Sequence, residues 1–112
     1  MRKGRSKGKV VRSSGNVFRD LGLPNAEEKQ TKVRLAVAIN QIIGKRQLSQ
    51  MAAARRLKTN QPKISALSKY RLDGFSVERL IHFLNALDRD VEIVIRRKPR
   101  SKRAARILVT AA

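Results

Sequence analysis

The chain of 112 residues contains no cysteine, and it has few aromatic and few acidic residues. Without cysteine, a disulfide framework and a thiolate metal site are both excluded, and a reducing compartment is compatible with the composition. The four aromatic residues, Tyr70, Phe75 and Phe83 among them, are too sparse for the base-stacking platforms that single-stranded nucleic-acid binders use. We therefore expect neither a disulfide-stabilised protein, nor a thiolate metal protein, nor a base-stacking binder of single strands.

Long apolar runs are also missing. No run approaches the roughly 18 residues that a helix needs to span a bilayer. The basic N-terminus lacks the apolar segment of a secretion signal. We therefore expect a soluble, cytoplasmic protein that makes no membrane contact.

The sequence shows no recognisable arrangement of catalytic residues. The acidic residues are scattered along the chain, and no nucleophile has an evident base and no glycine-rich phosphate loop is present. His82, the only histidine, is expected to be structural and not a ligand or base. We expect no enzyme, no metal and no cofactor.

The charge is strongly positive: 27 Lys and Arg against 8 acids give a formal net charge of +19, which predicts a polyanionic partner. Residues 1–12 and 96–106 contain only basic charges and hold 13 of the 19 net charges. We therefore expect one folded domain at 16–97 between flexible basic segments at 1–15 and 98–112. Each segment is either a solubilising arm or a phosphate-binding arm. The core of so short a chain is small, so oligomerisation would help to stabilise it.

The segment 48–67, LSQMAAARRLKTNQPKISAL, predicts a helix-turn-helix. Ala54 is small where the two helices would approach most closely. Thr59 and Asn60 can cap the second helix, and Pro62 falls in its first turn, where a missing N–H is tolerated. Apolar side chains face inward from both helices, namely Leu57, Ile64 and Leu67.

The second of these helices would project Gln61, Lys63 and Ser65 outward, and it is short enough to lie in a DNA major groove. Two other segments have apolar residues at helical spacing. We expect helices from near Asn25 to Gly44, from Gln50 to Leu57 after a Ser49 cap, from Gln61 to Ser68, and from a Ser76 cap through Leu87.

From Asp90 to Arg96 the period changes to the alternation that is typical of a strand. A lone strand is an unpaired edge, and the folded part offers no strong partner. We therefore expect it to pair with the same segment of a second molecule. The dimerisation residues would be Val91, Ile93, Val94 and Ile95. The alternative is pairing within the chain, with Val10–Val11 or Ile107–Thr110.

The motif at 48–67 resembles the XRE family, the Cro and lambda-repressor type of DNA-binding domain. Residues 13–97 resemble a subgroup that includes HigA-type antitoxins, through SSGNVFRDLGLPNAEE, QPKISAL and GFSVERLIHFLNALDRDVEIVIR. The resemblance implies a mainly α, lambda-repressor-like bundle of four to five helices with a C-terminal β-strand that pairs across a dimer. It also implies operator binding and a RelE/HigB-like toxin as partner.

The resemblance places Gln50 on a phosphate and Gln61 on base edges, where a glutamine amide can pair with adenine. Lys63 would reach guanine or a phosphate, and Ser65 a base or the backbone. Thr59 and Asn60 lie at the positive end of the recognition helix. From its position after that helix, Lys69 is either a solvated side chain or a non-specific phosphate contact. Lys58 departs from the family, which commonly has glycine with positive φ there, but it could adopt that conformation and add a phosphate contact.

The function expected is that of a dimeric, sequence-specific repressor that binds double-stranded DNA and serves as the antitoxin of a toxin–antitoxin pair. Two alternatives remain. The chain could be a stand-alone XRE-type regulator without a toxin. It could also be a general RNA- or ribosome-associated basic protein, which only the charge of the terminal segments suggests.

Overall fold

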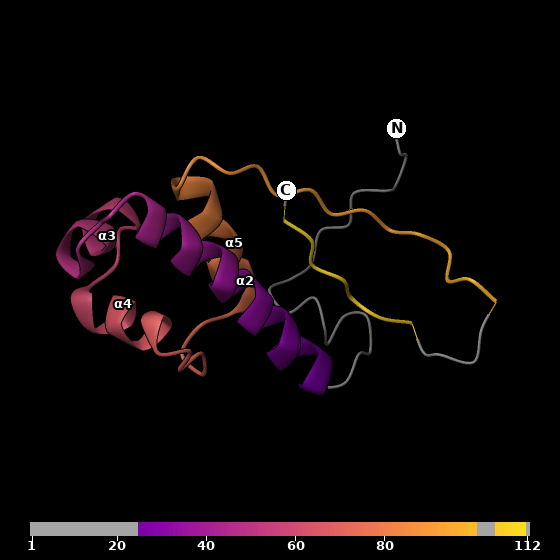
Figure 1. Ribbon diagram of the computed structural model, residues 1–112. Coiled ribbons are helices and arrows are strands. Elements are labelled where there is room, and N and C mark those ends of the chain that lie inside the picture. The colour runs from indigo at the N-terminus through magenta and orange to yellow at the C-terminus, as the bar shows by residue number, and fades with distance from the viewer. Residues whose placement is uncertain (1–24, 101–104, 112) are drawn as a thin grey trace.

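The computed structural model describes residues 25–100 and 105–111, and four helices lie within them. These are α2 (Asn25–Lys45), α3 (Gln50–Arg56), α4 (Gln61–Ser68) and α5 (Val77–Ala86). The long α2 crosses the middle of the fold, and it packs against α5 and α4 while α3 packs against α4 (Figure 1). The described part is therefore all-helical, with α3 and α4 forming the expected helix-turn-helix.

Each of the three short helices begins at a polar cap that satisfies a backbone N–H. Ser49 Oγ accepts from the amide of Ala52 at 3.0 Å, and Ser76 Oγ accepts from Arg79 at the same distance. Asn60 Oδ1 accepts from the amide of Lys63 at 2.9 Å. The predicted caps are confirmed, with Asn60 and not Thr59 capping α4.

Each helix is followed by a residue in the left-handed conformation, and none of these residues is glycine. Lys58 shows the pattern: its φ is 56°, its own N–H donates to Arg55, and the N–H of Thr59 donates to the carbonyl of Ala54. This Schellman arrangement occupies carbonyls that the helix itself leaves free. The left-handed residues are Gln47, Lys58, Tyr70 and Asp88. Gly44 does not end α2, which continues to Lys45.

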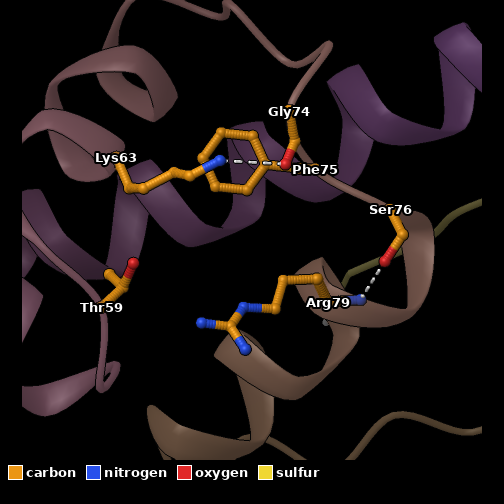
Figure 2. Close-up of a pocket in the computed structure, with 6 residues that line it drawn as sticks. All are labelled: Thr59, Lys63, Gly74, Phe75, Ser76 and Arg79. Atoms are coloured by element: carbon orange, nitrogen blue, oxygen red, sulfur yellow. Dashed lines mark hydrogen bonds between the residues drawn. The ribbon is translucent and has the colours of Figure 1, made fainter.

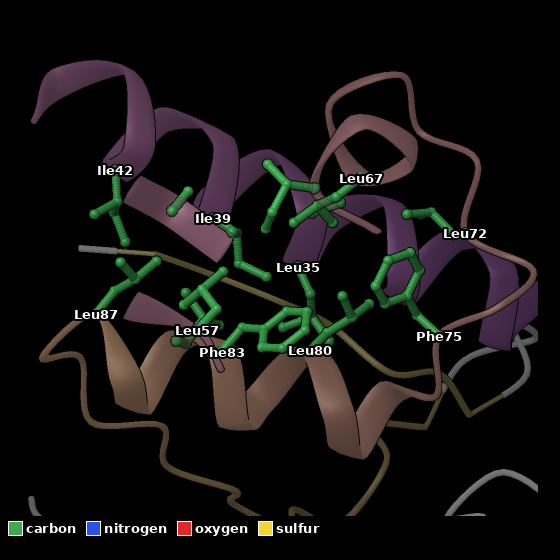
Figure 3. Close-up of a cluster of buried hydrophobic side chains, with 14 of the residues drawn as sticks. Leu35, Ile39, Ile42, Leu57, Leu67, Leu72, Phe75, Leu80, Phe83 and Leu87 are labelled. Carbon is green, nitrogen blue, oxygen red and sulfur yellow. The ribbon is translucent and has the colours of Figure 1, made fainter. Parts of the chain in front are cut away.

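The core lies between α2 and α5 and extends under the helix-turn-helix (Figure 3). Ile39, Leu67, Leu80 and Leu87 are the largest side chains that are fully buried. Phe75 and Phe83 meet edge to face, with ring centroids 6.0 Å apart, a preferred aromatic geometry. The inward positions predicted at Ala54, Leu57, Ile64 and Leu67 are all buried.

The C-terminal β-strand expected at 90–96 is not formed. This segment is extended, but no strand occurs in the part of the chain that the structure describes, including 107–110 (Figure 1). A ladder needs two paired segments, and no segment that the structure describes forms one with 90–96, where Ile93 and Ile95 are exposed. Val91, Ile107 and Val109 instead pack against the helical core.

The expected N-terminal arm at 1–15 and the Val10–Val11 segment lie outside the described residues. Among the helices at 25–100, none is long and apolar enough to cross a bilayer.

Candidate nucleic-acid interface

The helix-turn-helix presents α4 to solvent on one side and holds it to the core on the other. Ile64 and Leu67 are 3% and 0% exposed, and they fix the inward side of α4. Asn40 of α2 donates from Nδ2 to the carbonyl of Leu67 at 3.1 Å. Since this bond joins the longest helix to the C-terminal turn of α4, it fixes the orientation of the recognition helix.

Most of the expected DNA-contacting residues are accessible around this helix. Ala54 at the crossing of α3 and α4 is 7% exposed, so the two helices approach closely there. Thr59, Lys63 and Ser65 are half-buried. The exposed residues are Gln50, Lys58, Asn60, Gln61 and Lys69.

Helical geometry separates these residues into two sides of α4. At about 100° per residue, Ser65 lies about 40° from Gln61 around the axis, whereas Lys63 lies about 200° from it. Gln61 and Ser65 can thus face the same surface of a ligand. Lys63 projects from the other flank, towards the loop between α4 and α5.

On that flank, the ammonium group of Lys63 is already in contact with the protein. Its Nζ donates to the carbonyl of Gly74 at 3.1 Å and lies 5.0 Å from the centroid of the Phe75 ring. Figure 2 shows the side chain stretched across to this loop. A Cβ at position 74 would lie only 2.8 Å from Nζ, so a side chain there would make the ammonium group shift from this place.

Beside Lys63 is a shallow pocket of about 380 Å³. The guanidinium of Arg79 points into it from α5, and the hydroxyl of Thr59 lines the opposite side (Figure 2). The guanidinium of Arg79 also lies over the Phe83 ring, with Cζ 5.1 Å from the ring centroid. The other lining residues are Gly74, Phe75 and Ser76.

Arg79 was not among the site residues expected from the sequence, although one local signal could have identified it. It occupies the third position of α5 after the Ser76 cap, where a capping box has Glu or Gln. A cation in the first turn is disfavoured by the helix dipole. A positive charge at this position therefore suggests a role other than helix stability.

Other basic side chains near the motif are engaged within the fold. Arg56 pairs with Asp88 at 2.8 Å and donates from Nε to the carbonyl of Ala86 at 3.1 Å. Arg46 donates to the carbonyl of Leu87 at 2.9 Å. Both cations thus lie at the C-terminal end of α5, where the helix dipole is negative.

Within residues 25–100 and 105–111, no group of three or more His, Cys, Asp or Glu side chains could hold a metal ion. His82 is exposed on α5. The side chains expected to contact DNA supply amides, hydroxyls and cations.

Comparison with known proteins identifies the family to which this chain belongs. Residues 17–96 match a family described as a helix-turn-helix domain. A solved structure assigned to the XRE family of transcriptional regulators is 67% identical, with a TM-score of 0.76, over 80% of this chain and 100% of that chain. The chain belongs to the XRE family. No curated protein matches it.

The XRE family consists of DNA-binding transcriptional regulators and not of enzymes, so the helix-turn-helix of this member is a DNA-binding domain. The family assignment gives α4 the role of recognition helix.

Proposed function

We propose that this XRE-family chain is a sequence-specific repressor that inserts α4 into the major groove of double-stranded DNA. The observation that carries the proposal is the exposed amide of Gln61, at the start of a recognition helix whose other side is fixed in the core. A glutamine amide in the groove can donate to adenine N7 and accept from adenine N6.

Around Gln61, the expected contacts divide into bases and phosphates. Ser65 shares the side of α4 on which Gln61 lies, so it reaches a base or the adjacent sugar-phosphate backbone. Gln50 at the start of α3, Lys58 in the turn and Lys69 after α4 contact phosphates. Asn60 and Thr59 lie at the N-terminal end of α4 and approach the same backbone.

We propose that the functional unit is a homodimer formed through residues 91–95. Ile93, Val94 and Ile95 are 53%, 36% and 49% exposed, which is unusual for three consecutive β-branched residues. The same extended segment of a second copy is the simplest partner, because pairing of two identical edges satisfies the backbone hydrogen-bonding groups of both. Val91 already packs against the helical core, so the interface would continue from it.

The experiment that tests the function is selection of bound duplexes from a random pool, followed by footprinting of the winners. A dimer predicts a pseudo-palindrome with half-sites centred about 34 Å apart, or a multiple of this spacing. Recovery of no consensus would refute sequence-specific binding. Competition by bulk RNA without any preference among DNA duplexes would instead support a general RNA-associated protein.

A second candidate function is that of an antitoxin, which the resemblance of residues 13–97 to HigA-type proteins favours. In that case a RelE/HigB-like toxin is a further partner, and DNA binding represses the operon of the pair. A small RelE-like reading frame beside the gene, and co-purification of its product with this chain, test the idea. A stable protein that purifies alone from cells expressing such a neighbour would contradict it and leave a stand-alone regulator.

A further inference from the structure

We propose that Lys63 and Arg79 form a two-cation clamp for a single DNA backbone phosphate, at the pocket between α4 and α5, and that Lys63 does not read bases. The inference rests on the proposed DNA-binding function and deepens it, because it assigns one flank of the recognition helix to affinity and the other to specificity. It also adds Arg79 to the interface.

The first support is the direction of Lys63. Its ammonium group is held by the Gly74 carbonyl at 3.1 Å and the Phe75 ring at 5.0 Å, on the flank of α4 that faces away from Gln61. A lysine that is restrained on this flank cannot share a base pair with Gln61. The major groove is about 12 Å wide and is bounded by two phosphate strands, so the flanks of an inserted helix meet phosphates.

The second support is the chemistry of the pocket. Two cations and the hydroxyl of Thr59 line it, and no acidic side chain does. Neither Lys63 nor Arg79 forms an ion pair with any residue that the structure describes. By contrast, Arg46 and Arg56 share Asp88. Two cations without an ion-pair partner can neutralise the charge of a phosphate diester. Together with the neighbouring hydroxyl, they can donate hydrogen bonds to its oxygens.

The third support is that both cations are positioned before any ligand arrives. Lys63 and Arg79 each contact an aromatic ring, Phe75 and Phe83, and these two rings contact one another in the core. Positioning of this kind lowers the entropy lost when a side chain is immobilised on binding. The absence of a Cβ at Gly74 gives Lys63 the room to occupy this place.

The test compares the salt dependence of binding for Lys63→Gln and Arg79→Gln with that of the wild-type chain. The affinity of each chain is measured on the selected duplex and on an unrelated duplex. Because the two cations share one phosphate, the double variant should lower the slope of log K against log salt by about 0.9, and each single variant should lower it by a part of this. The loss of affinity should be equal on both duplexes. Lys63→Arg and Arg79→Lys should restore the slope.

Arg89→Gln is the matched control. It removes one exposed charge just beyond the other end of α5, and its slope should equal that of the wild type. Circular dichroism melts establish that each variant is folded at the assay temperature. A glutamine variant that is not folded is replaced in the comparison by Lys63→Met or Arg79→Met, because methionine keeps an aliphatic side chain against the aromatic ring.

The outcomes separate this proposal from the one on which it rests. Slopes of Lys63→Gln and Arg79→Gln equal to those of Arg89→Gln would overturn the clamp, whatever sequence preference the wild type has. A loss for Lys63→Gln confined to one base pair would also overturn it, because Lys63 would then be a base reader. Reduced slopes on both duplexes, in a chain that prefers neither, would support the clamp and refute sequence-specific repression.

Discussion

Asn40 and Leu67 are joined by a hydrogen bond of 3.1 Å from the side-chain amide of α2 to a main-chain carbonyl of α4. The two residues are 27 positions apart in the sequence. The bond connects the helix that builds much of the core with the helix that we propose enters the major groove. Its main effect is to fix how the recognition helix lies on the scaffold.

Asn40→Ala should lower the free energy of unfolding by about 1 to 2 kcal/mol, because it leaves the partly buried carbonyl of Leu67 without its donor. Urea denaturation measures the change. Gln41→Ala is the matched control, since Gln41 is exposed on the same helix and its replacement should change stability by less than about 0.5 kcal/mol. Equal stability of the two variants would show that the bond contributes nothing.

Asn60→Ala removes the cap of α4. It should lower the free energy of unfolding by about 1 kcal/mol, since the amide of Lys63 loses its side-chain acceptor. Asn60→Ser keeps an acceptor oxygen and should stay close to the wild type. If both substitutions destabilise the chain equally, a loss other than the cap is responsible.

Lys58→Gly should raise the free energy of unfolding by about 0.5 to 1 kcal/mol, because glycine adopts the positive φ of 56° without the contact between Cβ and the backbone. Lys58→Ala removes the same charge and keeps the Cβ, so it should give no such gain. Thermal melts of the two variants measure the difference. A more stable alanine variant would contradict the left-handed strain.

Deletion of residues 1–12 removes six basic residues and no acid. If this arm binds phosphates, affinity should fall on every duplex, and the slope of log K against log salt should flatten by about 0.9 for each phosphate that the arm neutralises. An unchanged slope would leave the arm with a solubilising role only. The measurement therefore decides between the two interpretations that the charge pattern allows.

Much of the fold could be predicted because its determinants are local. Caps at Ser49, Asn60 and Ser76 need only a short polar side chain before an apolar period, and all three form as expected. The left-handed turn at Lys58 followed from the known form of the motif. The ends of the other helices were predicted to within one residue from the apolar period. The left-handed residues that follow them, Gln47, Tyr70 and Asp88, were not predicted, because glycine is the usual signal for that conformation.

The features that the sequence could not predict depend on contacts between distant segments. Alternation at 90–96 indicates a strand, but a strand forms only beside another strand, and no second segment is at hand in the described chain. The position of Lys63 likewise depends on a loop that is 11 residues away. The interactions of Arg46 and Arg56 with the end of α5 are of the same kind. Residue spacing along one helix carries no information about such contacts.

The most direct test of the central claim is the binding of Gln61→Ala to the selected duplex and to all single base-pair variants of one half-site. We expect a loss of about 1 to 3 kcal/mol on the selected duplex, together with loss of discrimination at one base pair and unchanged discrimination at the others. A loss of equal size on every duplex, or no loss at all, would contradict base recognition by Gln61.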